Sequence, residues 1–441
     1  MKVAFSTLGC RVNVYESEAM AEKFIREGYE VVDFTKVADV YVINTCTVTN
    51  MGDKKSRQII GRARRLNNDA VIAVVGCYSQ IAPNEISAIE GVDVVLGTRN
   101  KGEIVYWVNR AIDEQTQIIQ VADNIIKNNV FEDLNIEEYQ DKTRAFLKIQ
   151  DGCNRFCSYC LIPYARGGVC SKKPERIVEE ITKLAQHGFK EIILSGIHTA
   201  SYGVDLEDNI TLVDILEKIE DIDGIERVRI GSIDPTFFTE DVRNRIIKLK
   251  KLCPHFHLSL QSGCDETLKR MNRRYTSKEY EDIVIMLQEA FENVSITTDV
   301  IVGFPGETED EFNKTFEFLS KIKLSKMHIF KFSPRKGTKA ASMENQIDGS
   351  VKEQRSKVLI NLNNKNENDF MKKFEKTTTS VLFEEEIEGK EGLYQGYTPN
   401  YVKVVAKSSS SSIIGEILDT KILNIKNDVL EGEILSDRHC R

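Results

Sequence analysis

The chain has 441 residues, of which 41% are hydrophobic and 29% are charged, and its formal net charge is −8 at pH 7. This length and composition predict a soluble globular protein of about three domains, and the acidic balance argues against wholesale coating of nucleic acid. No apolar run is long enough for a membrane span, and the N-terminal one is too short for a secretory signal. We therefore expect a cytoplasmic protein, in which ten cysteines favour metal or redox chemistry over disulfides.

The first segment, residues 1–112, is expected to form an open parallel α/β sheet. Apolar runs of strand length at 3–8, 40–44, 71–75 and 92–96 alternate with helix-like stretches at 16–27, 53–66 and 104–112. The first three strands run into Cys10, Cys46 and Cys77, and parallel strands end at one edge of a sheet. Buried free cysteines are common, but the repetition favours one three-thiolate cluster at this edge.

Residues 113–143 are polar and acidic and are expected to be a linker. Residues 144–371 then repeat a strand–helix unit about six times, which predicts a complete or partial barrel of parallel strands with its site at their C-terminal ends. The expected strands are 145–149, 191–195, 227–230, 255–260, 295–302 and 326–332. The last segment, 372–441, is expected to be a small β-barrel with strands at 381–383, 401–405, 413–417 and 430–434.

Three closely spaced cysteines follow the first strand of the central segment. Cys153, Cys157 and Cys160 have the spacing C-x3-C-x2-C. Three thiolates can hold a 4Fe-4S cluster while leaving one iron without a protein ligand, and such an iron can bind and reduce a small molecule. The alternative is a structural zinc site, which needs a fourth ligand, and the nearest candidate is Cys170.

These motifs resemble those of the radical S-adenosylmethionine (SAM) methylthiotransferases, and the resemblance extends over nearly the whole chain. It rests on the cysteine motif and on residues 9–17, 44–49, 76–80, 258–263, 298–308 and 332–338. The tail resembles the small RNA-binding TRAM barrel of that family. Residues 11–13, 47–49 and 272–276 resemble the MtaB-type branch, which acts on N6-threonylcarbamoyladenosine in tRNA. The branches that act on isopentenyladenosine in tRNA or on a ribosomal protein aspartate remain alternatives.

The resemblance implies a reaction and its cofactors. Two 4Fe-4S clusters are implied, a radical SAM cluster on Cys153, Cys157 and Cys160 and an auxiliary, sulfur-bearing cluster on Cys10, Cys46 and Cys77. The reaction would methylthiolate carbon 2 of N6-threonylcarbamoyladenosine next to the anticodon, at position 37, because a carbon radical can replace an unactivated C–H bond. The partners implied are the anticodon stem-loop of tRNA and an electron donor such as a flavodoxin or ferredoxin.

Further residues are candidates for contact with SAM or RNA. For SAM they are Tyr159, Gly196, Gln261, Gly303, Gly306 and Glu307, where the glycines would allow close approach of the backbone. For RNA they are Lys54, Lys55, Arg57, Arg62, Arg64 and Arg65, then Lys269, Arg270, Arg273 and Arg274, and in the tail Tyr397, Tyr401, Lys403 and Lys407. A hypothesis of another class is a zinc-stabilised RNA-binding protein without catalysis. Cys170, Cys253, Cys264 and Cys440 have no spacing that predicts a site.

Overall fold

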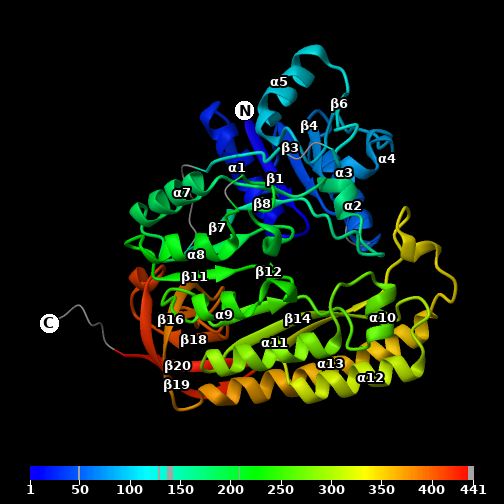
Figure 1. Cartoon of the computed structure of the whole chain (residues 1–441). Helices are drawn as coiled ribbons and strands as arrows, with labels where there is room; N and C mark the ends of the chain where they lie inside the picture. The colour runs from blue at the N-terminus through cyan, green and yellow to red at the C-terminus, as the bar shows by residue number, and fades with distance from the viewer. Residues whose placement is uncertain (48–49, 128–129, 137–142, 208, 436–441) are drawn as a thin grey trace.

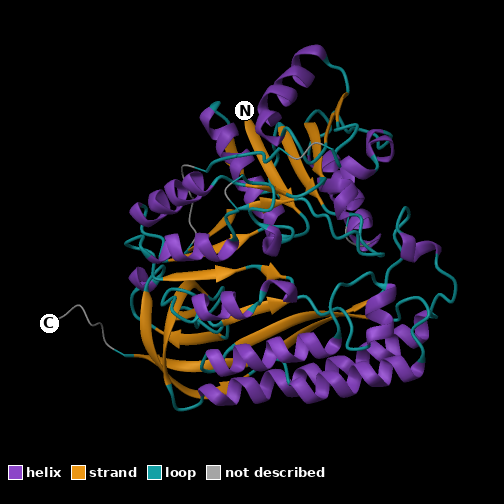
Figure 2. Cartoon of the chain, viewed as in Figure 1, coloured by secondary structure: helices purple, strands orange, loops and turns teal. Residues whose placement is uncertain are grey.

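The computed structural model describes residues 1–47, 50–127, 130–136, 143–207 and 209–435. In Figure 1 the N-terminal α/β unit lies above a central unit of parallel strands, and a small C-terminal barrel packs against one end of the central unit. Figure 2 shows the central strands facing inward and most of the helices outward. Among the described helices, none combines the length and hydrophobicity that crossing a membrane requires.

The N-terminal unit is a parallel sheet with helices on both faces. Its strand order is β2-β1-β3-β4-β5-β6, with β1 Lys2–Thr7, β2 Glu30–Val32, β3 Val40–Thr45, β4 Val71–Gly76, β5 Val94–Leu96 and β6 Ile118–Gln120. Helices α1 (Arg11–Arg26) and α5 (Ile104–Glu114) bury one face, and α2 (Asn50–Leu66) with α4 (Pro83–Ser87) buries the other. The expected parallel sheet is present.

The expected linker begins inside this sheet. Strand β6 pairs in parallel with β5, although its residues belong to the segment that we expected to be a linker. The strand has only three residues, of which only Ile118 is buried. It is therefore too short to show the alternation of apolar and polar residues by which a strand is predicted from sequence.

The central unit is an open half-barrel made of two sheets. The sheet β11-β10-β7 combines β7 (Arg144–Lys148), β10 (Glu191–Ser195) and β11 (Arg227–Ile230). The sheet β12-β13-β14-β15 combines β12 (Ser232–Ile233), β13 (His255–Leu258), β14 (Ser295–Val302) and β15 (Lys326–Lys331). All pairings are parallel, and β12 follows β11 after one glycine. The covering helices are α7 Pro174–Gln186, α8 Leu212–Glu220, α9 Glu240–Ile246, α11 Ser277–Ala290, α12 Glu309–Ile322 and α13 Gly349–Met371.

The C-terminal unit is a closed barrel of five strands. The sequence predicts a small β-barrel here, but several of its strand positions differ from those in the structure. The order is β16-β17-β18-β20-β19, with β16 Thr378–Glu386, β17 Leu393–Tyr397, β18 Lys403–Lys407, β19 Ile417–Lys426 and β20 Val429–Ile434. The strand expected at 413–417 is wrong, because a helical turn, η6 (Ser411–Ile413), precedes β19. Strand β17 is missing from the sequence prediction because Gly396 interrupts its alternation of apolar and polar residues. Glycine is needed at this position, since a Cβ on Gly396 would meet the Leu382 carbonyl oxygen at 2.2 Å.

Candidate active site

Three adjacent strands of the N-terminal sheet bring three cysteines to one edge. Strands β1, β3 and β4 are neighbours; Cys10 is the N-cap of α1, Cys46 follows β3, and Cys77 begins α3 (Cys77–Ile81). A Cβ placed on Gly9 would lie only 2.9 Å from Cys46 Sγ, which shows how tightly these turns meet. Burial raises the pKa of the Cys77 thiol, and the nearby Cys10 adds to this shift.

Glycines make these two turns possible. Gly9 has φ 102° and Gly76 has φ 101°, a region that residues with a Cβ rarely adopt. At Gly76 a Cβ would meet Asn44 Oδ1 at 2.6 Å. Each turn therefore needs glycine for its backbone angle and for the space beside it.

The second set of cysteines lies in the loop after β8 (Gln150–Asp151), and each of its thiols accepts a hydrogen bond. The backbone N–H of Arg155 donates to Cys153 Sγ at 3.4 Å, and that of Ile162 donates to Cys160 Sγ at 3.4 Å. The guanidinium of Arg273 donates to Cys157 Sγ, also at 3.4 Å. N–H donors at a sulfur favour its thiolate form, which is the form that binds iron.

Arg273 was expected to contact RNA phosphates, and its position contradicts that expectation. Its side chain is only 9% exposed and reaches Cys157 from inside the molecule. It also pairs with Asp234 at 3.5 Å and donates to the Tyr275 hydroxyl at 2.8 Å. Spacing in the sequence could not reveal this role, because the contact joins residues that are 116 positions apart.

The second set of thiols suits iron ligation in its donor chemistry. Burial raises the pKa of Cys153, and burial with the neighbouring thiols raises the pKa of Cys160 to about 12. Without iron these thiols hold their protons at neutral pH, so ligation must release them. Three sulfur ligands, each with its own N–H donor, fit a 4Fe-4S cluster that keeps one iron open.

A network of buried charges lies between the two cysteine sets. Glu16 of α1 pairs with Lys101, with Lys148 at 3.0 Å and with Arg166 of α6 (Ile162–Arg166) at 2.9 Å. Asp151 pairs with Lys148 at 2.6 Å and with Arg166 at 3.0 Å. Burial would raise the pKa of Glu16, but its three cationic partners outweigh burial and hold it well below its usual value.

One cavity is bounded by neighbours of both cysteine sets. It has a volume of about 630 Å³ and is lined by Thr47 and Tyr78, which follow Cys46 and Cys77, and by Leu161, which follows Cys160. Arg335 lines it, where it donates to Thr47 Oγ1 at 2.6 Å and pairs with Asp53 at 2.7 Å. The cavity therefore adjoins residues next to both cysteine sets, although no cysteine lines it.

A second cavity, of about 410 Å³, opens from the central cysteine loop toward solvent. It is lined by Cys157, Cys160, Phe156, Tyr164, Lys269, Arg270 and Lys339 among others. Phe156 and Tyr164 are 40% and 44% exposed, and Lys269 and Lys339 are exposed cations. A larger cavity of about 980 Å³ between α11, α12 and α13 lies on the helical side of the sheet, remote from both cysteine sets.

The candidate SAM residues fall into two groups. Tyr159 packs its ring edge-on against Phe304, with ring centroids 6.3 Å apart, in a cluster against which Ile301 of β14 also packs. Gln261 has φ 73° and bonds through its backbone to Asp299 and Ile301 of β14. Gly196 lies against Gln150, where a Cβ would meet Oε1 at 2.9 Å. Contact of these three residues with SAM remains a prediction.

The second group forms the turn after β14. Gly303 donates its N–H to Glu307 Oε2 at 2.6 Å, and the same oxygen accepts from Arg355 at 2.7 Å. Gly303 has φ 70° and a Cβ there would meet the Lys352 side chain at 2.3 Å, while Gly306 has φ 75°. Glu307 therefore holds this turn in shape, and SAM contact by Gly303, Gly306 and Glu307 remains a prediction.

The other residues singled out in the sequence are placed as follows. Lys54, Lys55, Arg62 and Arg65 are exposed on α2, whereas Arg64 donates to the Ala70 carbonyl at 3.2 Å. Tyr401 packs beneath the guanidinium of Arg229 at 4.6 Å and so joins the barrel to the central unit, and its contact with RNA remains a prediction. Cys170, Cys253 and Cys264 are buried, and Cys440 lies outside the described residues.

Comparison with known proteins agrees with this arrangement. The model of "Uncharacterized protein family UPF0004" matches residues 2–97, and that of the Radical SAM superfamily matches residues 147–319. The chain is 44% identical over 436 residues to a threonylcarbamoyladenosine tRNA methylthiotransferase MtaB of Bacillus subtilis, covering 98% of this chain and 96% of that protein. It is 42% identical to an MtaB of Aquifex aeolicus (85% and 90%) and 37% identical to a tRNA-2-methylthio-N(6)-dimethylallyladenosine synthase of Clostridium tetani (97% and 95%).

Solved structures show the same fold at low sequence identity. The radical SAM methyltransferase TsrM from Kitasatospora setae superposes with a TM-score of 0.56 at 16% identity, over 77% of each chain. The cobalamin-dependent SAM radical enzyme OxsB superposes with a TM-score of 0.52 at 12% identity, over 84% of this chain and 56% of that chain.

Proposed function

The chain belongs to the MtaB-type family of tRNA methylthiotransferases, and on that basis we propose that it adds a methylthio group to carbon 2 of N6-threonylcarbamoyladenosine next to the anticodon of tRNA. Within this proposal Cys153, Cys157 and Cys160 hold the radical SAM cluster, and Cys10, Cys46 and Cys77 hold the auxiliary cluster. The expected domains are 1–112, 144–371 and 372–441, joined by the linker 113–143.

The observation that carries this proposal is the cavity between the two cysteine sets. Its walls include Thr47 and Tyr78 on one side and Leu161 on the other, each adjacent in sequence to a cysteine. A methylthio transfer needs radical formation and a sulfur source on two sides of one substrate atom. A protein that only bound RNA would have no need for two sets of cysteines whose neighbouring residues line one cavity.

The protein's own residues bind, orient and shield, while the cofactors supply the chemistry. When bound, two 4Fe-4S clusters and SAM provide one-electron reduction and sulfur transfer that no side chain can perform. Arg273 orients Cys157 by its hydrogen bond to Sγ, and the backbone N–H groups at Cys153 and Cys160 act in the same way. Arg166 and Glu16, both fully buried, form an ion pair that holds the central unit against α1 of the N-terminal unit.

Recognition of the anticodon stem-loop is proposed for the exposed cations of α2. Lys54, Lys55, Arg62 and Arg65 lie on the helix that follows Cys46. Cations on such a face contact phosphates and set the register of the RNA without reading its bases. Single-stranded loops present bases that can be unstacked, so an anticodon loop can deliver its base to the cavity.

We also propose the surface where an electron donor docks and the compartment in which this occurs. Lys269 and Lys339 rim the 410 Å³ cavity that reaches Cys157 and Cys160, beside the exposed ring of Phe156. An acidic redox protein such as a flavodoxin or ferredoxin would complement this surface. Such donors and tRNA share the cytoplasm, which is the location we propose.

Mass spectrometry of tRNA nucleosides tests the proposed function. In a strain lacking the gene, 2-methylthio-N6-threonylcarbamoyladenosine should disappear and N6-threonylcarbamoyladenosine should accumulate, and the wild-type gene should restore the product. Unchanged 2-methylthio-N6-threonylcarbamoyladenosine would rule out the proposal, and loss of the methylthio derivative of isopentenyladenosine instead would assign the chain to the other tRNA substrate.

A further inference from the structure

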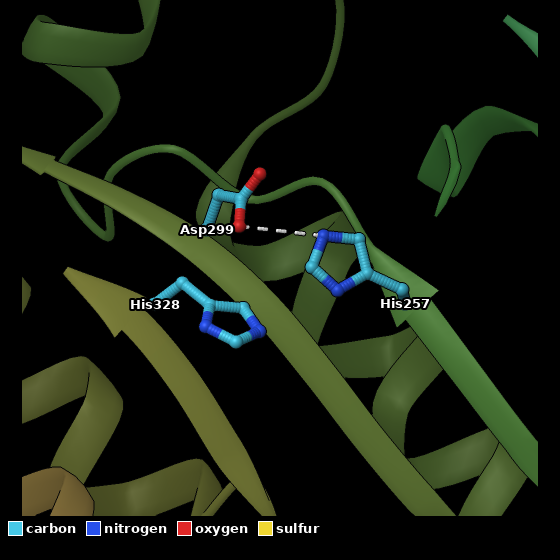
Figure 3. Close-up of side chains that lie close together, drawn as sticks. All are labelled: His257, Asp299 and His328. Carbon is cyan, nitrogen blue, oxygen red and sulfur yellow. Dashed lines mark ion pairs between the residues drawn. The ribbon is translucent and has the colours of Figure 1, made fainter. Parts of the chain in front are cut away.

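Three side chains that no part of the proposed function uses converge inside the half-barrel. His257, Asp299 and His328 come from the neighbouring strands β13, β14 and β15 (Figure 3). Each offers one ligand atom, and these atoms all lie within 4.8 Å of one another. Within the described part of the chain, no other three His, Cys, Asp or Glu side chains meet this spacing.

The strand register explains why the three meet. Asp299 and His328 are direct partners across β14 and β15, and His257 is the direct partner of Thr297, two residues before Asp299. Residues two apart on a strand share a face. The alternating neighbours Phe256, Val300 and Met327 are buried in the core beneath the helices, so the three ligand side chains lie on the concave face of the sheet.

This face is the one that leads to the central cysteine loop. Ile301 lies two residues beyond Asp299 on the same face and packs against the buried cluster around Phe304. Tyr159, which stands between Cys157 and Cys160, packs against the same cluster. Two residues of strand span roughly 7 Å. The three side chains therefore form the next layer of the half-barrel below the one that touches the cysteine loop.

The geometry suits a first-row divalent metal ion. Two histidines and one carboxylate with open positions form a set that binds Zn²⁺ or Fe²⁺. Ligand atoms about 2.0–2.1 Å from zinc in a tetrahedral site stand roughly 3.4 Å apart. His257 Nε2 and Asp299 Oδ1 are 3.5 Å apart (Figure 3), so this pair already has the required spacing.

The arrangement also orients one ligand and leaves access to the others. His257 Nδ1 lies 2.9 Å from Thr297 Oγ1, which directs Nε2 toward Asp299. A hydrogen bond at the second ring nitrogen is how metal-binding histidines are held in place. Asp299 is 33% exposed and His328 is exposed, so an ion and a further ligand can reach the site.

We propose that His257, Asp299 and His328 bind one divalent metal ion, zinc or iron(II), whose open coordination position faces the lumen of the half-barrel. The two neutral imidazoles and one carboxylate leave the bound ion with a net positive charge. Its remaining position takes an oxygen anion, and the carboxylate of a threonylcarbamoyl group belongs to that class. This last step rests on the proposed function, whereas the metal site does not.

The test is a zinc titration of the anaerobically reconstituted holoenzyme, without RNA or SAM. Calorimetry with zinc chloride should show one site per chain, with iron remaining at about eight per chain because both clusters stay intact. An iron(II) titration followed by desalting and iron analysis distinguishes the two metals. If wild-type protein takes up neither metal beyond its clusters, or if zinc binds only as iron is lost, the proposal is overturned.

Variants identify the ligands. His328→Ala, at an exposed position, should weaken zinc binding by about 100-fold or more, and Thr297→Val should weaken it by roughly 10–100-fold by freeing the His257 ring. The control is His187→Ala, at an exposed ring that meets the Lys183 carbonyl oxygen at 2.7 Å, which should bind zinc as wild type does. Equal zinc affinity in His328→Ala and wild type would overturn the assignment.

A separate assay tests the role toward substrate. His328→Ala should raise KM for threonylcarbamoyl-containing RNA by about tenfold or more, while the control His187→Ala should keep the wild-type KM. An unchanged KM would overturn the substrate role and leave the metal site in place. If wild-type enzyme made no methylthio product at all, the proposed function would fail, but the zinc titration contains no RNA and would still decide the metal site.

Discussion

Arg166 donates a hydrogen bond of 2.6 Å to the Oδ1 of Asn13, joining residues 153 positions apart. Asn13 lies three residues after Cys10 and Arg166 lies six residues after Cys160. Asn13 in turn donates to the Leu8 carbonyl at 2.7 Å and to the Thr45 carbonyl at 3.0 Å, which precede Cys10 and Cys46. One fully buried arginine therefore couples the loops of both cysteine sets.

The turns before the first cysteine set should not tolerate a methyl group. Gly9→Ala and Gly76→Ala each force a Cβ into a left-handed turn and against an atom less than 3 Å away. We expect iron content to fall from about eight to about four per chain, because only the auxiliary cluster is lost, together with a stability loss of more than about 1 kcal/mol. Iron analysis and thermal unfolding measure these two effects.

Gly28→Ala is the matched control for this prediction. Gly28 has φ 81°, but a Cβ there would meet nothing within 4 Å. This variant should lose stability through backbone strain but keep all its iron. Equal iron loss in Gly28→Ala and Gly9→Ala would contradict the claim that crowding beside Cys46 matters.

The buried network should make stability depend on pH through Glu16. Its pKa is well below the usual value in the folded chain and about 4.3 when unfolded, so the unfolded state binds the proton more readily. The stabilisation is therefore complete above about pH 5 and is lost as pH falls below about 4. Glu16→Gln should remove this contribution and cost about 3–5 kcal/mol at pH 7, because its cationic partners stay buried.

Thermal unfolding between pH 7 and pH 3.5 measures this effect. Glu179→Gln, on the exposed face of α7, serves as the control and should leave the unfolding midpoint unchanged. If Glu16→Gln and wild type lost stability in parallel as the pH falls, Glu16 would not be the source of the pH dependence.

Arg273 should set the reducibility of the central cluster. Arg273→Lys keeps the charge but loses the planar donor set that reaches Cys157 Sγ, Asp234 and Tyr275 together. Hydrogen bonds to the sulfurs favour the more negative, reduced cluster, so its potential should fall and SAM cleavage should slow by about tenfold or more, with iron content retained. A redox titration measures the potential directly. Arg274→Lys, at the exposed neighbouring residue, should match wild type, and an unaltered potential in Arg273→Lys would refute this role.

Much of the first cysteine site was predictable because parallel strands end at one edge. The positions of Cys10, Cys46 and Cys77 after three short apolar runs were enough to place them together, and β1, β3 and β4 are adjacent. Local patterns could not assign Glu16 or Arg166, because a charged residue on a helix is usually exposed. Their burial depends on contact between α1 and α6, and the spacing of residues along a single sequence does not reveal such a contact.

The same reason explains the other missed residues. His257, Asp299 and His328 are isolated in sequence and meet only through the register of β13, β14 and β15. Strand β6 forms because it pairs with β5, and not because its own three residues favour a strand. Contacts between distant segments decide these features, whereas the cysteine spacing and the strand–helix alternation are local.

The basic rim of the 410 Å³ cavity should control electron delivery by a protein donor. Lys269→Glu with Lys339→Glu should slow SAM cleavage by about tenfold or more when a reduced flavodoxin is the donor, since charge reversal weakens association. With dithionite, a small reductant that needs no docking surface, the rate should stay near wild type.

Lys248→Glu with Lys250→Glu, at two exposed lysines after α9, is the charge-matched control. An equal loss with dithionite would mean damage to the cluster, and no loss with flavodoxin would place the donor elsewhere. If Lys269→Glu with Lys339→Glu kept its cleavage rate with flavodoxin but lost affinity for tRNA, the surface would belong to RNA instead.

Comparison of Cys10→Ala with Cys153→Ala tests most directly the claim that two separate cysteine sets serve one substrate. Each anaerobically reconstituted variant is incubated with SAM, dithionite and tRNA that contains N6-threonylcarbamoyladenosine, and cleaved SAM and methylthiolated nucleoside are quantified by mass spectrometry. Cys10→Ala should still cleave SAM but form no methylthio product, and Cys153→Ala should do neither. Methylthio product from Cys10→Ala, or SAM cleavage by Cys153→Ala, would contradict the account.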